Sequence, residues 1–189
     1  ITQHISAYQT EFQGRKITLL DTPGHEAFAS IRQHGALLTD IVVIVVAADD
    51  GVKPQTVEAI KFAESANAKI IVAITKVDKP TANVEMVKGQ LASEYRLNPE
   101  EWGGDTIMVP VSGRTGEGID KLLESILLIA EMEEFKADYD YLSEGLVIEA
   151  RMRQGKGAVV GLLVQHGELQ VGDILVAGGS YGKIRTIVD

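Results

Sequence analysis

The 189-residue sequence contains no cysteine. That absence excludes disulfides, thiolate metal sites and a thiol nucleophile. The sequence also lacks a long hydrophobic run: the longest, 41–48, has the length of a strand, whereas a membrane-spanning helix needs about 20 apolar residues. No basic region followed by an apolar signal stands at the N-terminus. We therefore expect a soluble protein of the cytoplasm that makes no contact with a membrane.

Positive charge is also scarce, because 18 Lys and Arg residues stand against 27 Asp and Glu residues and leave a net charge of -9. Such a balance argues against a broad electrostatic surface for nucleic acid or anionic membrane, so any RNA contact must be local. A small basic cluster does occur at Arg151, Arg153 and Lys156. An exposed strand face explains it more simply than an RNA contact, and both interpretations stay open.

Strands alternate with helices over most of the chain. Two short strands, 5–12 and 16–20, predict a hairpin. The segments that follow predict strands at 41–48, 69–74 and 106–111, and helices from Glu26 and at 54–67, 83–95 and 119–132. Apolar runs without alternation suit strands that are buried on both faces of a parallel sheet. The prediction for this part is an α/β fold with a doubly wound, mostly parallel sheet.

Helical periodicity ends near Met132, and short strands follow at 146–150, 158–164, 174–177 and 183–188. Turns rich in glycine separate them, which is typical of the start of an antiparallel, all-β barrel. We predict one domain over 1–142 and a second over 143–189. Because the chain begins without Met and so few strands would leave open sheet edges, we expect further sequence beyond both ends.

Polar residues stand where the predicted strands end, and ligands of doubly wound sheets bind outside the carboxyl ends of the strands. Asp21 ends one strand, and Gly24 and His25 follow it. An Asp there can hold Mg²⁺ through water, and a Gly just beyond it lets a backbone N–H approach a terminal phosphate. His25 would then face the attacking water. The pattern is short, and a strand followed by a Pro-Gly turn is the simpler alternative.

Two later strand ends carry a second set of polar residues. At the first, Asp78 could accept two hydrogen bonds from the edge of a guanine base while the stem of Lys76 lies over the ring. At the next, Ser112 and Gly113 would let backbone N–H groups reach the base oxygen. Each motif alone is usually just a turn. In this order, and each at a strand end, they resemble the later signature elements of a GTP-binding domain.

Four longer stretches extend this resemblance over nearly the whole chain. They are ITQHI at 1–5, DTPGHEAF at 21–28, ADDGVKPQT at 48–56 and EGLVIEA at 144–150. Together they closely resemble the bacterial translation initiation factor two family. The resemblance implies a GTPase that uses GTP/GDP and Mg²⁺ and acts on the ribosome, and we expect a monomer. It also implies a role in initiator tRNA binding and ribosomal subunit joining, with the tRNA bound by domains carried further along.

The resemblance also implies roles for single residues. Thr2 matches the first-switch threonine that binds Mg²⁺, and Ile1 matches the apolar residue that screens the catalytic histidine. Asp21 matches the water-mediated Mg²⁺ partner, Gly24 the donor to the γ-phosphate, and His25 the residue that positions the hydrolytic water. The guanine-reading element and its companion loop are matched by Thr75, Lys76, Asp78, Ser112 and Gly113.

The chain departs from the family pattern at three places. Thr75 stands where the family has Asn, and its shorter hydroxyl predicts weaker binding with guanine preference kept through Asp78. Gly113 stands where Ala is usual, a mild change because the useful group there is a backbone N–H. No G-x-x-x-x-G-K-[ST] loop occurs, and the family carries that loop ahead of the first switch. We therefore expect these 189 residues alone to bind GTP poorly, without useful hydrolysis.

Two other functions fit the same residues. One is a non-catalytic docking or regulatory module with a GTPase-like fold, and the other is another translational GTPase, such as an elongation or selenocysteine-specific factor. The remaining charged pairs suggest no further site, because Asp49–Asp50 and Glu133–Glu134 are interpreted as a turn and as solvated charge. Three histidines show no metal-ligand spacing and are interpreted as surface or strand residues: His4, His34 and His166.

Overall fold

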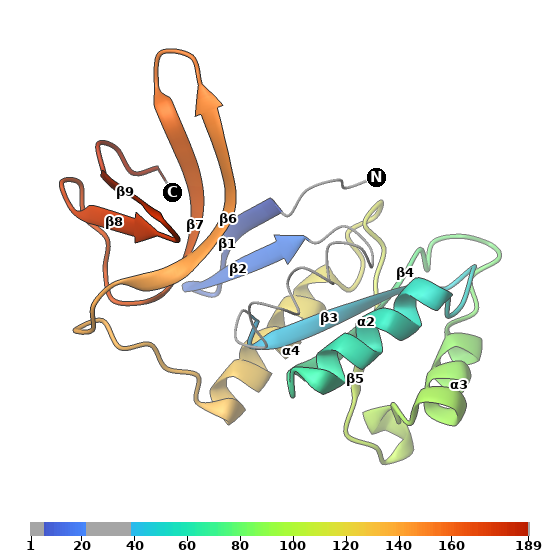
Figure 1. Ribbon diagram of the computed structural model, residues 1–189. Helices are drawn as coiled ribbons and strands as arrows, with labels where there is room; N and C mark the ends of the chain where they lie inside the picture. Colours follow the sequence, from blue (N-terminus) through green and yellow to red (C-terminus); the bar gives the residue numbers. More distant parts are fainter. Residues whose placement is uncertain (1–5, 22–38, 189) are drawn as a thin grey trace. The chain divides into compact units, whose positions relative to one another are not determined.

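The structure of the protein is a computed structural model that describes residues 6–21 and 39–188 (Figure 1). Contacts between residues divide the chain into two compact units, Ile1–Phe135 and Lys136–Asp189. Each unit has sheets of its own, and no strand of one is hydrogen-bonded to a strand of the other among the described residues.

The segment 136–142, just after this division, contacts residues 166–167 within the second unit. The Gly167 amide donates a hydrogen bond to the Asp138 carbonyl at 2.8 Å. The ring of Tyr141 meets that of His166 edge-on, with the ring centroids 6.2 Å apart. These contacts explain why the division falls ahead of the boundary at 142 that the sequence suggests.

The first unit begins with an antiparallel hairpin of β1, Ser6–Phe12, and β2, Arg15–Asp21. Its turn residues Gln13 and Gly14 both have positive φ, 51° and 73°. Two-residue turns of this kind match the right-handed twist of the strands that they join. The predicted hairpin is confirmed.

A three-stranded parallel sheet follows, in the order β3-β4-β5. Its strands are β3, Ile41–Ala47, β4, Lys69–Thr75, and β5, Ile107–Pro110. The helices are α2, Pro54–Ser65, α3, Val84–Tyr95, and α4, Ile119–Glu133, with a short 3-10 helix, η1, at Glu100–Trp102. These strands and α-helices confirm the predictions for this stretch, η1 was not predicted, and the helix predicted from Glu26 lies outside the described residues. In the described part of the chain, none of the helices combines the length and the apolar character needed to cross a membrane.

Both faces of the parallel sheet are covered (Figure 1). Val72 of β4 lies in a cluster that includes Leu91 and joins the sheet to α2 and α3. The preceding residue, Ile71, lies in a second cluster with Ile126 of α4 and Ile17 of β2. Ile71 and Val72 have no exposed surface, as expected for a strand that is buried on both faces. The unit is thus the predicted α/β fold with a doubly wound, mostly parallel sheet.

The second unit consists of two antiparallel hairpins. Its strands are β6, Glu144–Arg153, β7, Gly157–His166, β8, Ile174–Ala177, and β9, Ser180–Lys183. The predicted strand at 183–188 is wrong, because β9 ends at Lys183. Only Ile184 continues the pairing, exchanging backbone hydrogen bonds with Gly172 and Asp173 just ahead of β8, and 185–188 pair with no strand of the described residues.

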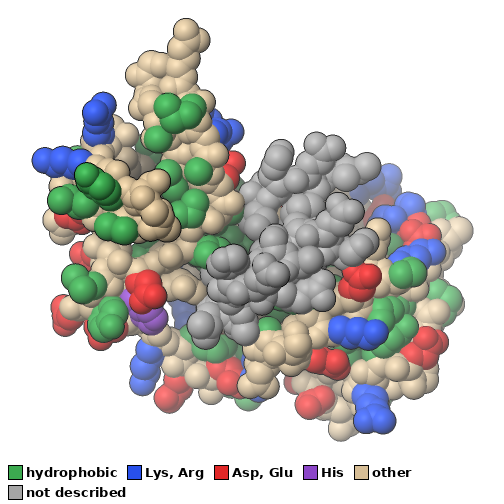
Figure 2. Space-filling model, viewed as in Figure 1, with side chains coloured by type: hydrophobic (Ala, Val, Ile, Leu, Met, Phe, Trp, Pro, Cys, Tyr) green, Lys and Arg blue, Asp and Glu red, His purple; other side chains and the backbone are tan. Residues whose placement is uncertain are grey.

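None of the described residues 136–188 is buried. Apolar side chains therefore lie on the surface of this unit, as the upper left of Figure 2 shows. Ile174 and Val176 are examples, with 72% and 70% of their surface exposed. The antiparallel strands agree with the predicted start of a β-barrel.

Candidate functional site

The carboxyl ends of β3, β4 and β5 lie level at one edge of the sheet. The parallel register pairs Ala47 with Thr75 and Ile74 with Pro110. Hydrogen bonding continues past the strand ends, because the Ala48 amide donates to the Thr75 carbonyl at 2.8 Å. The loops that leave these strands are therefore neighbours, at the edge where doubly wound sheets bind their ligands.

Asp78 and Ser112 meet at this edge, from the loops after β4 and β5. The Ser112 hydroxyl donates to Asp78 Oδ1 at 2.7 Å, and Arg114 Nε donates to Asp78 Oδ2 at 2.9 Å. The Ser112 hydrogen bond is the largest of the effects that hold the pKa of Asp78 below its usual value, and the burial of the carboxylate opposes it. The side chain keeps 14% of its surface exposed. An ionised carboxylate has about four acceptor positions, so Asp78 can accept further donors from a ligand.

The loop after β5 holds Ser112 in place. Its hydroxyl accepts a hydrogen bond from the Thr115 amide at 3.2 Å, and its own amide donates to the Glu117 carbonyl at 2.9 Å. Gly118 then precedes α4 with a φ of 74°, and a Cβ at this position would collide with the Pro110 carbonyl. Only glycine lets the chain return this close to β5.

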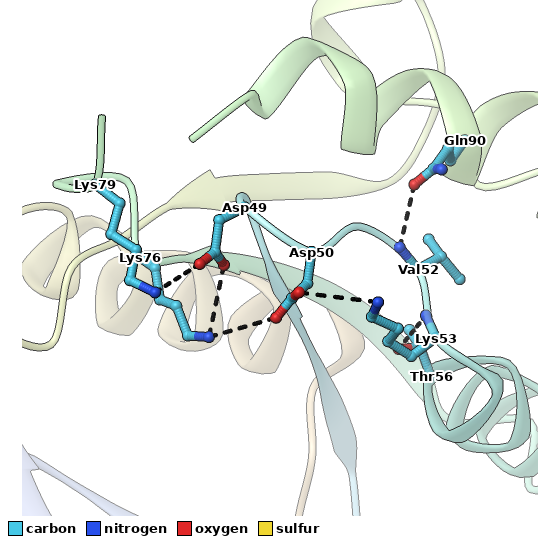
Figure 3. A network of polar contacts seen from close by, with 8 residues as sticks. All are labelled: Asp49, Asp50, Val52, Lys53, Thr56, Lys76, Lys79 and Gln90. Atoms are coloured by element: carbon cyan, nitrogen blue, oxygen red, sulfur yellow. Dashed lines mark hydrogen bonds and ion pairs between the residues drawn. The ribbon is translucent and has the colours of Figure 1, made fainter. Parts of the chain in front are cut away.

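Lys76 lies beside two aspartates that follow β3 (Figure 3). Its Nζ is 3.5 Å from Asp49 Oδ1 and 3.6 Å from Asp50 Oδ2. Lys79 comes closer, with Nζ 2.6 Å from Asp49 Oδ2. The Lys79 hydrogen bond is the first cause that lowers the pKa of Asp49, and the same contact raises the pKa of Lys79. Lys76 itself has a φ of 60°, which is uncommon for a residue with a side chain.

Two departures from the family pattern fit the local geometry. Thr75 Oγ1 lies 3.5 Å from the Val46 carbonyl oxygen, a long contact toward β3. A methyl group added at Gly113 would meet no atom within 4 Å, so alanine would fit there as well.

The structure brings together the site residues at the carboxyl end of β4 and in the loops after β4 and β5. These are Thr75, Lys76, Asp78, Ser112 and Gly113. Asp21 ends β2, where it pairs with Ser6 in the hairpin. Thr2, Gly24 and His25 lie outside the described residues, as does Ile1, so their roles stay predictions.

Sequence analysis missed Arg114 and Lys79. Asp49 lies in the predicted turn after β3, but the prediction that it is a solvated charge is wrong. The Asp49 side chain is only 13% exposed and pairs with two lysines. The pairing of Asp49 with Lys76 could have been predicted, because Asp49 comes after β3 and Lys76 after β4. The carboxyl ends of neighbouring parallel strands lie at one edge of the sheet. Arg114 stands two residues after Ser112 in a polar turn and gave no signal of its own.

Comparison with protein families agrees with this geometry. The model of the elongation factor Tu GTP binding domain matches residues 1–132, and that of elongation factor G domain 2 matches residues 143–189. Translation initiation factor IF-2 of Lachnoclostridium phytofermentans is 60% identical over 189 residues, which are 100% of this chain and 17% of that protein. That of Clostridium novyi is 57% identical, and the chain spans 28% of its length. The resemblance to bacterial initiation factor two is thus confirmed, over a small part of each relative.

Solved structures share the fold. Elongation factor SelB of Methanococcus maripaludis, in complex with the GTP analogue GppNHp, has a TM-score of 0.71 and 29% identity, covering 92% of this chain and 38% of that one. GDP-bound aIF5B of Aeropyrum pernix has a TM-score of 0.72 and 26% identity over the same shares. Because the first family model covers 132 of the 189 residues, the chain belongs to the family of the elongation factor Tu GTP-binding domain.

Proposed function

We propose that this chain is the GTP-binding core of a translation initiation factor, a GTPase that hydrolyses GTP on the ribosome. Hydrolysis would act as a switch during initiator tRNA binding and ribosomal subunit joining. The identity of 60% to a translation initiation factor IF-2 supports this proposal. The observation that carries it is Asp78, held by the Ser112 hydroxyl at the edge of a parallel sheet. Since ribosomes are its proposed partner, we expect the protein to act in the cytoplasm, as a monomer.

Asp78 is suited to read guanine. The base offers neighbouring N–H donors on its ring and on its exocyclic amine, and one carboxylate can accept both. Adenine does not present the same pair, so it would leave a partly buried carboxylate without partners. Lys76 can lay its stem over the base, and the backbone at Ser112 and Gly113 can donate to the base oxygen. Thr75, in place of Asn, would make the binding weaker without changing the preference.

The proposed phosphate end of the site rests on the resemblance. Thr2 and Asp21 would hold Mg²⁺, Gly24 would donate to the γ-phosphate, and His25 would position the hydrolytic water. Mg²⁺, when bound, neutralises charge on the phosphate oxygens. Asp21 suits this role, since it is an exposed carboxylate at a strand end and Mg²⁺ prefers carboxylate oxygens.

We also propose that a GTP-binding domain, predicted over 1–142, is followed by a β-barrel domain, predicted over 143–189; the contacts divide the chain slightly earlier, after Phe135. The family matches to 1–132 and 143–189 support a boundary in the interval between them.

The proposal is tested by equilibrium titration of the full-length protein with GDP and with ADP. We expect GDP to bind at least about a hundredfold more tightly, because only guanine satisfies Asp78. Equal affinities would contradict the proposal. Ribosome-stimulated GTP hydrolysis, compared between the protein and its His25→Ala variant, tests the catalytic part, and unchanged rates would exclude the proposed role of His25.

The alternatives have less support. Another translational GTPase is represented by SelB, at 29% identity against 60% for the initiation factor. A non-catalytic docking module would not need the carboxylate of Asp78 to stay reachable at the sheet edge, and no observation favours that function.

A further inference from the structure

Two adjacent aspartates after β3 differ sharply in their surroundings. The side chain of Asp49 is 13% exposed, whereas that of Asp50 is 52% exposed. Asp49 Oδ2 accepts a hydrogen bond from Lys79 Nζ at 2.6 Å. Asp49 Oδ1 is buried and has no hydrogen-bond partner in the described part of the chain, although Lys76 Nζ lies 3.5 Å away. The two lysines therefore offset the cost of burying the negative charge of this carboxylate.

Both lysines belong to the turn that carries the base-reading carboxylate. Lys76 and Lys79 flank Asp78 in sequence, and the Lys79 amide closes the turn by donating to the Lys76 carbonyl at 3.1 Å. Asp49 thus contacts the turn at both of its ends (Figure 3). Its side chain joins the end of β3 to the turn that follows β4.

The same turn is anchored on the other side of Asp78 by Ser112. That hydroxyl reaches Asp78 from the loop after β5. The turn is therefore held from both neighbouring strands, by Asp49 from β3 and by Ser112 from β5. Since Lys76 has a left-handed backbone, its conformation needs support from its surroundings.

From this geometry we propose that Asp49 is a positioning residue of the guanine site. It acts through Lys79 and Lys76, fixing the turn so that Asp78 and the stem of Lys76 face the base. The inference rests on the proposed function, because it assumes that this edge binds guanine nucleotide. Asp49 itself need not touch the nucleotide.

Asp50 provides a matched control. It contacts Lys76 at 3.6 Å and Lys53 at 3.8 Å, but it is half exposed and does not reach Lys79. Replacing either aspartate by asparagine removes one negative charge from the same loop. A difference between the two variants therefore reports position and not net charge.

The experiment is titration of the full-length protein with GDP and with IDP, which lacks the exocyclic amine of guanine. We expect Asp49→Asn to weaken GDP binding by about tenfold, since charge-assisted hydrogen bonds contribute on that scale, and Asp50→Asn by less than about threefold. We also expect Asp49→Asn to reduce the preference for GDP over IDP. A purely structural role would weaken both nucleotides equally.

A second variant guards against misfolding. Lys79 is half exposed, so Lys79→Met leaves the core in place. We expect it to weaken GDP binding, as Asp49→Asn does. The double variant Asp49→Asn with Lys79→Met should then bind GDP as tightly as Asp49→Asn alone, because both substitutions break the same contact between Asp49 and Lys79. Additive losses, or GDP binding by Asp49→Asn equal to that of the unaltered protein, would overturn the inference. If the unaltered protein binds no GDP, the proposed function fails, and the inference fails with it.

Discussion

The parallel sheet of the first unit and the hairpins of the second differ in how far their residues are buried. Ile71 and Val72 of β4 have no exposed surface, because elements pack on both faces of the sheet. Among the described residues 136–188, by contrast, none is buried. The first unit thus supplies a fixed edge on which charged loops can be held, and the described part of the second does not.

The ion pairs at the sheet edge of the first unit differ in the same way from a pair in β6 of the second. Arg114 and Lys79 reach carboxylates that are only 14% and 13% exposed, those of Asp78 and Asp49. In β6 the pair of Arg151 and Glu149 has a similar distance, 2.9 Å, but both side chains are about half exposed. Exposed pairs contribute little to stability because water competes for them. Ion pairs of similar length therefore contribute differently to stability, depending on how far the carboxylate is buried.

The largest expected effect tests the difference in burial directly. Leu91 of α3 has no exposed surface, so Leu91→Ala should lower the free energy of unfolding by about 2–5 kcal/mol. Leu162→Ala in β7 makes the same change at a half-buried position. The protein has one tryptophan, Trp102, which lies in the first unit, so its fluorescence during urea unfolding reports that unit. We expect Leu162→Ala to leave this transition in place, and equal shifts would contradict the comparison.

The next effect concerns the carboxylate at the sheet edge. Asp78→Asn replaces an acceptor by an amide donor where guanine also donates, so GDP affinity should fall by at least about a hundredfold in an equilibrium titration. Arg114→Ala is the control, because it removes the partner of Asp78 Oδ2 and keeps the carboxylate. Arg114 is 79% exposed, so we expect a change of less than about fivefold. A loss as large as that of Asp78→Asn would make Arg114 part of the binding site.

Sequence reasoning predicted the parts of this arrangement that depend on local pattern. The unbroken apolar run of 69–74 predicted a buried strand, and the strand-end positions predicted that Asp78 and Ser112 meet. The prediction that 41–48 is buried on both faces is wrong at Val45 of β3, which is 60% exposed. The failures depend on partners distant in sequence. From its neighbours in sequence, Asp49 looks like a solvated charge, because the lysines that pair with it come from another strand end. The strand predicted at 183–188 fails because 185–188 have no partner strand among the described residues.

A smaller effect is expected in acid. The folded protein holds the pKa of Asp49 below its ordinary value of 3.8, chiefly through Lys79, so the unfolded chain binds more protons at low pH. The stability that this carboxylate contributes is therefore present above about pH 3.8 and is lost as the pH falls through the lower, folded value. Urea unfolding is followed at Trp102 in a series of buffers from pH 5 downward, and the free energy of unfolding is compared between them. Lys79→Met should make the dependence on pH shallower because it removes the main cause, and an unchanged slope would contradict this.

The smallest effect is expected at Thr75. Its hydroxyl reaches the Val46 carbonyl only through a long contact of 3.5 Å, so it fixes the edge of the sheet less firmly than Ser112 fixes Asp78 at 2.7 Å. Asparagine has a longer side chain with two donors, and Thr75→Asn should raise GDP affinity by about threefold without changing the preference for guanine. Thr75→Val keeps the shape without the hydroxyl, and its affinity should stay close to that of the unaltered protein. Titration of both variants with GDP and IDP separates the change in affinity from a change in guanine preference. No gain in GDP affinity with asparagine would contradict the prediction and would mean that the loops at this edge are already held as firmly as the nucleotide requires.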